Sequence, residues 1–114
     1  MDNCIFCKIA KKELPSTIVY EDDKVLAFND INPVAPVHVL IIPKTHIKNV
    51  MELTEQNADM IKDIHLAAKN IAVKLGIEDK GYRLITNCGE EAGQTVFHLH
   101  YHLIGGKKLG ANII

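Results

Sequence analysis

Residues 97–104 read Phe-His-Leu-His-Tyr-His-Leu-Ile, which places His98, His100 and His102 at alternate positions. An apolar or aromatic residue fills every gap between them. A period of two is typical of a β-strand, because successive side chains of a strand point to opposite faces. The sequence therefore predicts a strand with three imidazoles on one face and apolar side chains on the other.

Working outward, apolar runs and turn residues divide the remaining chain into five further elements. We expect strands over residues 17–21, 25–29, 37–43 and 82–87, and a helix with Thr54 as its N-cap and Gly76 at its end. The order β-β-β-α-β-β predicts an α+β protein in which one long helix packs on a five-stranded antiparallel sheet. No linker or repeat interrupts residues 1–114, so we expect a single domain.

The composition narrows the classes of partner. Thirteen basic residues against 14 acidic ones give a net charge of −1, which argues against binding of nucleic-acid polymers but leaves room for small anionic ligands. No run of 18 apolar residues and no basic-then-apolar leader is present, so neither a membrane span nor a signal peptide is expected. The predicted location is the cytoplasm, with no membrane partner.

The cysteines agree with a reducing compartment. Cys4, Cys7 and Cys88 form an odd, sparse set rather than a disulfide framework. The C-x-x-C pair suggests metal ligation or redox chemistry, although no βαβ pattern surrounds it and the two residues can also be incidental reduced thiols.

The histidine strand allows three interpretations. Its imidazoles can be structural hydrogen-bonding groups, ligands of one metal ion, or catalytic groups in which one nitrogen attacks a phosphorus or acyl centre. Three titratable groups on one face favour chemistry over packing.

A zinc site could combine ligands from the C-x-x-C pair and from the histidine strand. Cys4 and Cys7 supply half of a Cys2His2 set, and structural zinc prefers four protein ligands. His46 follows the predicted strand end at Pro43, and one histidine of the strand could complete the site.

We also consider the two remaining histidines and the loop before the histidine strand as parts of a site. His38, within a strand, is a structural hydrogen bonder or a residue that fixes the tautomer of a catalytic ring, whereas His65, in the helix, is expected to be solvated. In the loop over residues 87–95, Gly93 lets backbone amides approach an oxyanion, and three side chains, Asn87, Gln94 and Thr95, can donate hydrogen bonds to phosphate oxygens. A P-loop motif is absent.

These residues resemble the signature of the histidine triad (HIT) family, His-φ-His-φ-His-φ-φ with φ apolar. Further matches in the family's order cover most of the chain, at residues 5–9, 20–23, 27–31, 42–46, 81–83 and 93–97. The end of the signature, Leu103-Ile104-Gly105-Gly106, is similar to the Hint branch of nucleoside phosphoramidases.

The resemblance implies a homodimer with a joined antiparallel sheet that binds a purine nucleotide on each triad face. The implied reaction is hydrolysis of the P–N bond of a phosphoramidate of AMP, such as adenylated lysine, to a nucleoside monophosphate and an amine. By position, His100 would form a nucleotidyl-histidine intermediate, His102 would contact the phosphate and leaving group, and His38 would orient the ring of His100.

The resemblance also implies ligand contacts. Asp30 aligns with the ribose-hydroxyl ligand. The apolar walls around base and ribose align with Ile5, Phe6, Ile9, Leu14, Phe28 and Ile31. The phosphate-binding positions align with Asn87, Gly93 and Thr95. The zinc site of some members aligns with Cys4, Cys7, His46 and His98, where a structural zinc would hold one end of the catalytic strand.

Three alternatives remain beside a zinc-containing phosphoramidase. One is a dinucleoside polyphosphate hydrolase of the same family. Another is a purine-nucleotide-binding module without catalysis. The third is a metalloenzyme that uses all three triad histidines for a catalytic ion.

Overall fold

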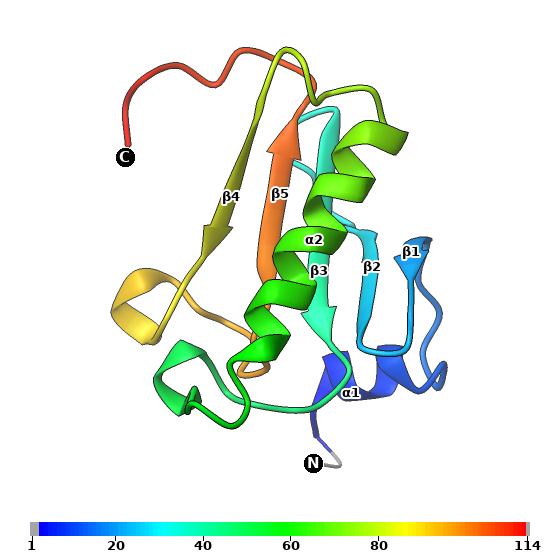
Figure 1. Ribbon diagram of the computed structural model, residues 1–114, viewed down its shortest axis with the longest axis vertical. Helices are drawn as coiled ribbons and strands as arrows, with labels where there is room; N and C mark the ends of the chain where they lie inside the picture. Colours follow the sequence, from blue (N-terminus) through cyan, green and yellow to red (C-terminus); the bar gives the residue numbers. More distant parts are fainter. Residues whose placement is uncertain (1–2, 114) are drawn as a thin grey trace.

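Five antiparallel strands form one sheet in this computed structural model, which describes residues 3–113 (Figure 1). Their order across the sheet is β1-β2-β3-β5-β4. In chain order the elements are α1 (Ile5–Ala10), β1 (Ile18–Glu21), β2 (Val25–Asn29), β3 (Val37–Pro43), the 3-10 turn η1 (Val50–Glu52), α2 (Asp59–Lys74), β4 (Tyr82–Thr86), the 3-10 turn η2 (Glu90–Ala92) and β5 (Tyr101–Gly105). The predicted fold class is confirmed, with strand limits that agree to within one residue for β1 to β4.

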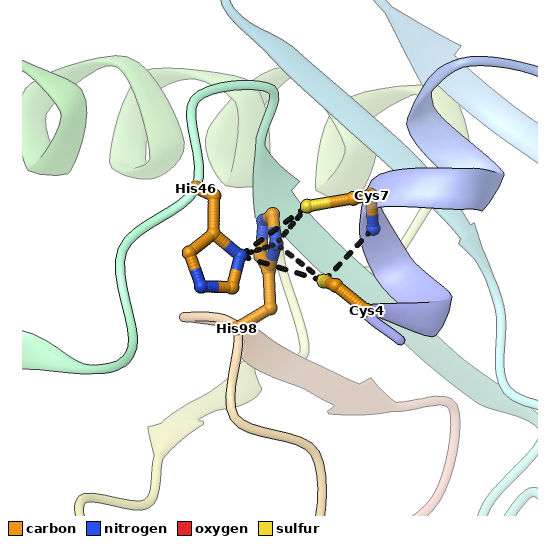
Figure 2. Close-up of side chains that lie close together, drawn as sticks. All are labelled: Cys4, Cys7, His46 and His98. Atoms are coloured by element: carbon orange, nitrogen blue, oxygen red, sulfur yellow. Dashed lines mark hydrogen bonds between the residues drawn. The ribbon is translucent and has the colours of Figure 1, made fainter. Parts of the chain in front are cut away.

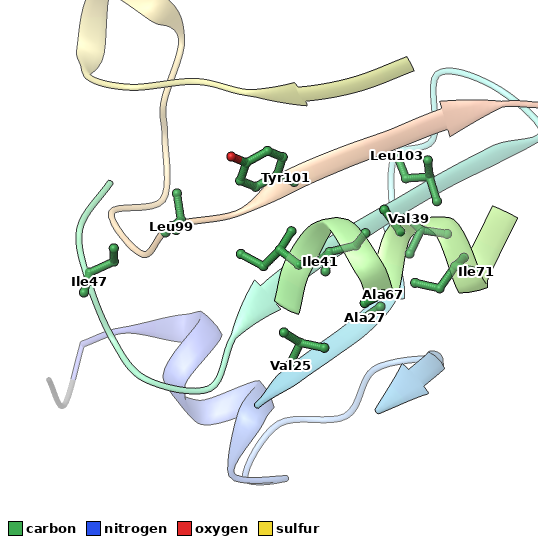
Figure 3. Packing of buried hydrophobic residues seen from close by; sticks show 12 residues of the cluster. Val25, Ala27, Val39, Ile41, Ile47, Ala67, Ile71, Leu99, Tyr101 and Leu103 are labelled. Atoms are coloured by element: carbon green, nitrogen blue, oxygen red, sulfur yellow. The ribbon is translucent and has the colours of Figure 1, made fainter. Parts of the chain in front are cut away.

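Helix α2 covers one face of the sheet (Figure 1). Its buried residues are largely small, including Ala67, Ala68 and Ala72, so its backbone can approach the sheet closely. Figure 3 shows the resulting core, in which side chains from α2 pack on those of the strands. The sheet residues of this cluster are Val25, Ala27, Val39, Ile41, Tyr101 and Leu103, joined by Ile47 and Leu99 from the loops.

The opposite face is covered in part by α1, which the sequence did not reveal. Phe6 and Ile9 of this helix pack on a second apolar cluster with Leu26, Phe28, Leu40 and Ile42 of the sheet. The helix has only six residues, and the Cys4 sulfur caps it by accepting the Cys7 N–H at 3.1 Å. A short helix with a thiol cap carries neither the length nor the usual capping residue that identify helices in a sequence.

The predicted histidine strand is correct only in its second half, because β5 begins at Tyr101. Tyr101 pairs with both β3 and β4, whereas the preceding backbone leaves the ladder: Leu99 donates to the Ile47 carbonyl at 2.7 Å. The alternation of side chains nevertheless continues. Leu99 and Tyr101 lie in the core beneath α2, while His100 lies against α1 on the other face.

Helix α2 also begins later than predicted. The Thr54 hydroxyl accepts a hydrogen bond from the Gln56 N–H at 3.2 Å and so caps a separate turn before the helix starts at Asp59. The predicted end is confirmed, because Gly76 follows the helix with φ of +72°. Within residues 3–113, no helix combines the length and the apolar character needed to cross a bilayer.

Candidate active site and metal centre

Four side chains from three separate segments meet beside α1 (Figure 2). Cys4 and Cys7 come from the start of α1, His46 from the loop after β3, and His98 from the segment before β5. The two sulfurs lie 3.2–3.4 Å from the Nδ1 atoms of the histidines, and these two nitrogens are 3.1 Å apart. The structure thus brings together all four residues predicted to bind zinc.

The spacing of these atoms fits a tetrahedral zinc ion. With Zn–S bonds of about 2.3 Å and Zn–N bonds of about 2.0 Å, a tetrahedron has S···N and N···N edges of roughly 3.3–3.6 Å. The His98 Nε2 lies 2.9 Å from the Pro43 carbonyl, which can only accept, so the proton is on Nε2 and the Nδ1 lone pair faces the cluster. Burial, followed by the neighbouring Cys4 thiol, raises the pKa of Cys7 to about 11, so a metal ion must displace the thiol proton when it binds.

A second group of potential metal ligands consists of Asp30, His38 and His102, but these side chains are joined by hydrogen bonds. The Val34 N–H donates to His38 Nδ1 at 3.1 Å, which places the His38 proton on Nε2. That Nε2 then donates to His102 Nδ1 at 2.9 Å, with an Asp30 carboxylate oxygen 3.4 Å away. Since the nitrogen that faces the group carries a proton, this is a hydrogen-bond network and not a metal site.

The same contacts correct one expected role. His38 was expected to orient the ring of His100, but its hydrogen bond goes to His102. The reason is the register between β3 and β5: His38 lies opposite Ile104, and His102 stands two residues before Ile104 on the same face of β5. His100 precedes the strand and lies beyond this reach.

His100 takes its orientation from the backbone. Its Nδ1 donates to the His98 carbonyl at 2.8 Å, so Nε2 keeps a lone pair. The Phe6 ring lies edge-on to the imidazole, with 5.0 Å between the ring centroids. Burial lowers the pKa of His100 against the opposing effects of the His98 carbonyl and the Asp30 charge, which keeps the ring neutral at pH 7.

His102 has the complementary tautomer. Because its Nδ1 accepts from His38, its proton is on Nε2, and the ring is 5.3 Å from that of His100. Burial, with smaller contributions from the positive charges that His100 and His38 would carry, lowers the pKa of His102 to about 4, although Asp30 opposes the shift. A neutral imidazole with an Nε2 lone pair therefore lies beside a neutral imidazole with an Nε2–H.

Several of the expected nucleotide contacts line one of two cavities. A cavity of about 430 Å³ is lined by Ile9, Phe28, Asp30 and Ile31, together with Pro15, Ser16, Thr17 and Asn29. Phe6 packs on Phe28 with 5.6 Å between the centroids, and Leu14 packs against the same cluster. Six of the predicted residues thus gather on the α1 side of the sheet.

Of the four remaining predicted contacts, two lie beside metal-site residues and two lie in the loop between β4 and β5. Ile5 and Thr95 line a separate cavity of about 410 Å³ with the metal-site residues Cys4 and His46. Asn87 follows β4, and Gly93 follows η2 with φ of +88°, a conformation that favours glycine. The loop over residues 87–95 therefore reaches from the end of β4 to this second cavity.

Gln94 has a structural role that the sequence did not indicate. Its side-chain oxygen accepts from Asn49 Nδ2 and the Gly89 N–H, and its nitrogen donates to the Lys48 and Val96 carbonyls, all at 2.8–3.1 Å. With both donors and both lone pairs used, this amide is not available for phosphate, contrary to expectation. It instead joins the loop after His46 to the segment before His98.

Comparisons with known proteins identify similar sequences over almost the whole chain. Residues 3–112 match a family model described as "Scavenger mRNA decapping enzyme C-term binding". An uncharacterised HIT-like protein of Rickettsia prowazekii is 48% identical over 92% of this chain and 88% of its own length. A "14 kDa zinc-binding protein" of Zea mays is also 48% identical, over 92% of this chain and 83% of its own length.

A solved structure gives the same result for the fold. A HIT family hydrolase from Clostridium thermocellum superposes with a TM-score of 0.98 and 66% sequence identity, covering 100% of this chain and 99% of its own. Together with the extent and identity of the sequence matches, this likeness shows that the chain belongs to the histidine triad (HIT) family.

Proposed function

We propose that this HIT protein hydrolyses the P–N bond of purine nucleoside phosphoramidates, of the AMP–amine or AMP–lysine type, through a nucleotidyl-histidine intermediate on His100. The observation that supports this most strongly is the pair of opposite tautomers. His100 presents an Nε2 lone pair and His102 an Nε2–H, each set by a hydrogen bond at the other ring nitrogen. A nucleophile beside a donor is what displacement at phosphorus requires.

The proposed reaction has two displacements. His100 Nε2 attacks phosphorus, the P–N bond to the amine breaks, and the amine leaves with a proton taken from the solvent. Water then attacks phosphorus and breaks the bond to His100, which releases the nucleoside monophosphate and returns a proton to the solvent. His102 donates from Nε2 to a phosphate oxygen or the leaving nitrogen, and the attacking imidazole needs no deprotonation because it is already neutral.

Nucleoside recognition is assigned to the cavity beside the histidines. Asp30 lines it and offers a carboxylate that can accept from both ribose hydroxyls, while Ile9, Phe28 and Ile31 supply apolar walls for a planar base. The Asp30 carboxylate is also 3.4 Å from His38 Nε2, which in turn donates to His102, and this supports a sugar site close to the proposed catalytic histidines.

The proposed cofactor is one structural zinc ion held by Cys4, Cys7, His46 and His98. When bound, zinc would cross-link three segments of the chain and would not act on substrate. The likeness to the maize zinc-binding protein supports this assignment. His98 connects the proposed zinc site to the proposed nucleophile, because the backbone carbonyl of His98 accepts a hydrogen bond from His100 Nδ1 at 2.8 Å.

We also propose that the protein acts as a homodimer. β4 is an edge strand that pairs with β5 on one side only, so its free edge can extend the sheet into a second copy.

Turnover of a phosphoramidate of AMP tests the proposal. We expect release of AMP by the native protein and complete loss of release in His100→Ala, with His65→Ala, a change of an exposed α2 histidine, as the matched control. Equal release by His100→Ala would overturn the mechanism. Faster turnover of a diadenosine polyphosphate would favour the alternative hydrolase, and AMP binding without any turnover would favour a binding module.

A further inference from the structure

A cavity of about 550 Å³ lies apart from the site described above. It is bounded by the connection from α2 to β4 and by the chain that follows β5, and its lining residues are Gly76, Ile77, Lys80, Gly81, Gly106, Lys107 and Lys108. Figure 1 shows both segments at the upper end of the sheet, away from α1 at the lower end.

The lining of this cavity is strongly basic. Lys80, Lys107 and Lys108 also line an adjoining groove of about 430 Å³, to which Arg83 contributes a fourth cation. Among residues 3–113, no acidic residue lines either space, although Glu78 and Asp79 are exposed in the neighbouring turn. A protein with a net charge of −1 thus has three lysines around this recess and an arginine in the groove beside it.

Three glycines and one side-chain hydrogen bond define the course of the backbone around the recess. Gly76, Gly81 and Gly106 all have positive φ, between +72° and +105°, which L-residues rarely adopt. A Cβ on Gly106 would lie 3.1 Å from the Pro36 Cβ, so the exit from β5 passes close to the loop before β3. Arg83 Nη2, near the start of β4, donates to the Gly110 carbonyl at 2.8 Å and so ties the segment after β5 to β4.

We propose that this basic recess binds the polyphosphate chain of a small phosphorylated ligand. Lys80, Lys107 and Lys108 are exposed and border the same recess, so an anion bound there would relieve the repulsion between their like charges. Its volume is in the range of small-molecule sites, and ammonium groups bind phosphate oxygens as point charges. The recess takes no part in the proposed hydrolysis, so ligand binding there constitutes a second site.

Binding of inorganic tripolyphosphate tests the proposal by nuclear magnetic resonance of the isotope-labelled protein. We expect saturable shifts of the Gly76, Gly81 and Gly106 amide signals, with an affinity that falls as salt is added. The Gly93 amide, in the loop before the triad, reports on any binding at the catalytic site instead. Shifts confined to Gly93, or shifts that never saturate, would overturn the proposal.

Substitutions provide the second test. Loss of one charge-assisted hydrogen bond should weaken binding about tenfold, so Lys80→Gln and Lys107→Gln should each raise the dissociation constant by that factor. Lys62→Gln and Lys69→Gln remove the same charge from exposed positions of α2 and should leave it unchanged. Equal affinity in all four variants would contradict the assignment, as would tighter binding of a single-stranded RNA than of tripolyphosphate.

Discussion

Replacement of Gln94 by leucine tests how the loops around the metal centre are held. Gln94 is 3% exposed and uses every hydrogen-bonding capacity of its amide. Leucine has a similar volume but no polar atoms, so the change removes four hydrogen bonds without creating a large cavity.

The magnitude follows from the partners left behind. A buried polar group without a partner costs roughly 1–3 kcal/mol, and four groups lose theirs: the Lys48 and Val96 carbonyls, the Gly89 N–H and the Asn49 amide. Asn49 is itself buried, whereas Lys48 is exposed and its carbonyl can reach water. We therefore expect a loss of about 2–4 kcal/mol, a large share of the ~5–15 kcal/mol of a typical domain.

Urea unfolding measures this loss as a change in the free energy of unfolding at constant m-value. Gln56→Leu provides the control, because Gln56 is exposed and its side chain forms no hydrogen bond within residues 3–113. A loss in Gln94→Leu that equals the loss in Gln56→Leu would refute the reasoning, since the four bonds would then contribute nothing.

Two further predictions concern protons and zinc. In metal-free protein, burial lowers the pKa values of His98 and His102 to about 4, below the ordinary value of 6.5. Between these two values the unfolded chain binds more protons than the folded one, so the free energy of unfolding should fall as the pH decreases. A constant free energy of unfolding from pH 7 to pH 5 would contradict this prediction. Chelation of zinc should lower the urea midpoint of the native protein. Metal analysis should find less zinc in Cys7→Ser than in the native chain, and an unchanged amount in Cys88→Ser, whose cysteine lies outside the four-residue cluster. Equal zinc in both variants would exclude the proposed ligands.

The sheet and α2 were predictable because their apolar residues recur with clear periods. Ile64, Ala68 and Ile71 follow helical spacing, and the run over β3 is almost wholly apolar. The short helix α1 gave no such signal. The start of β5 could not be predicted either, because the same alternation continues through His98 and Leu99 after the ladder partners have ended.

The candidate metal ligands were predictable from residue types and the family resemblance, since Cys4, Cys7, His46 and His98 do converge. The partner of His38 was not, because it depends on the register between β3 and β5, which alternation alone does not set. The role of Gln94 depends on the backbone carbonyls of Lys48 and Val96. Every residue has such a carbonyl, so the sequence does not indicate which ones a side chain will reach.

The proposed hydrolysis requires a covalent bond between His100 and phosphorus. Mass spectrometry of the native protein, mixed with a phosphoramidate of AMP under single-turnover conditions and quenched in alkaline denaturant, tests it directly. We predict an adenylyl group on the peptide that carries His100, and none in His100→Ala. Turnover without an adduct, or an adduct on a different side chain, would contradict the account.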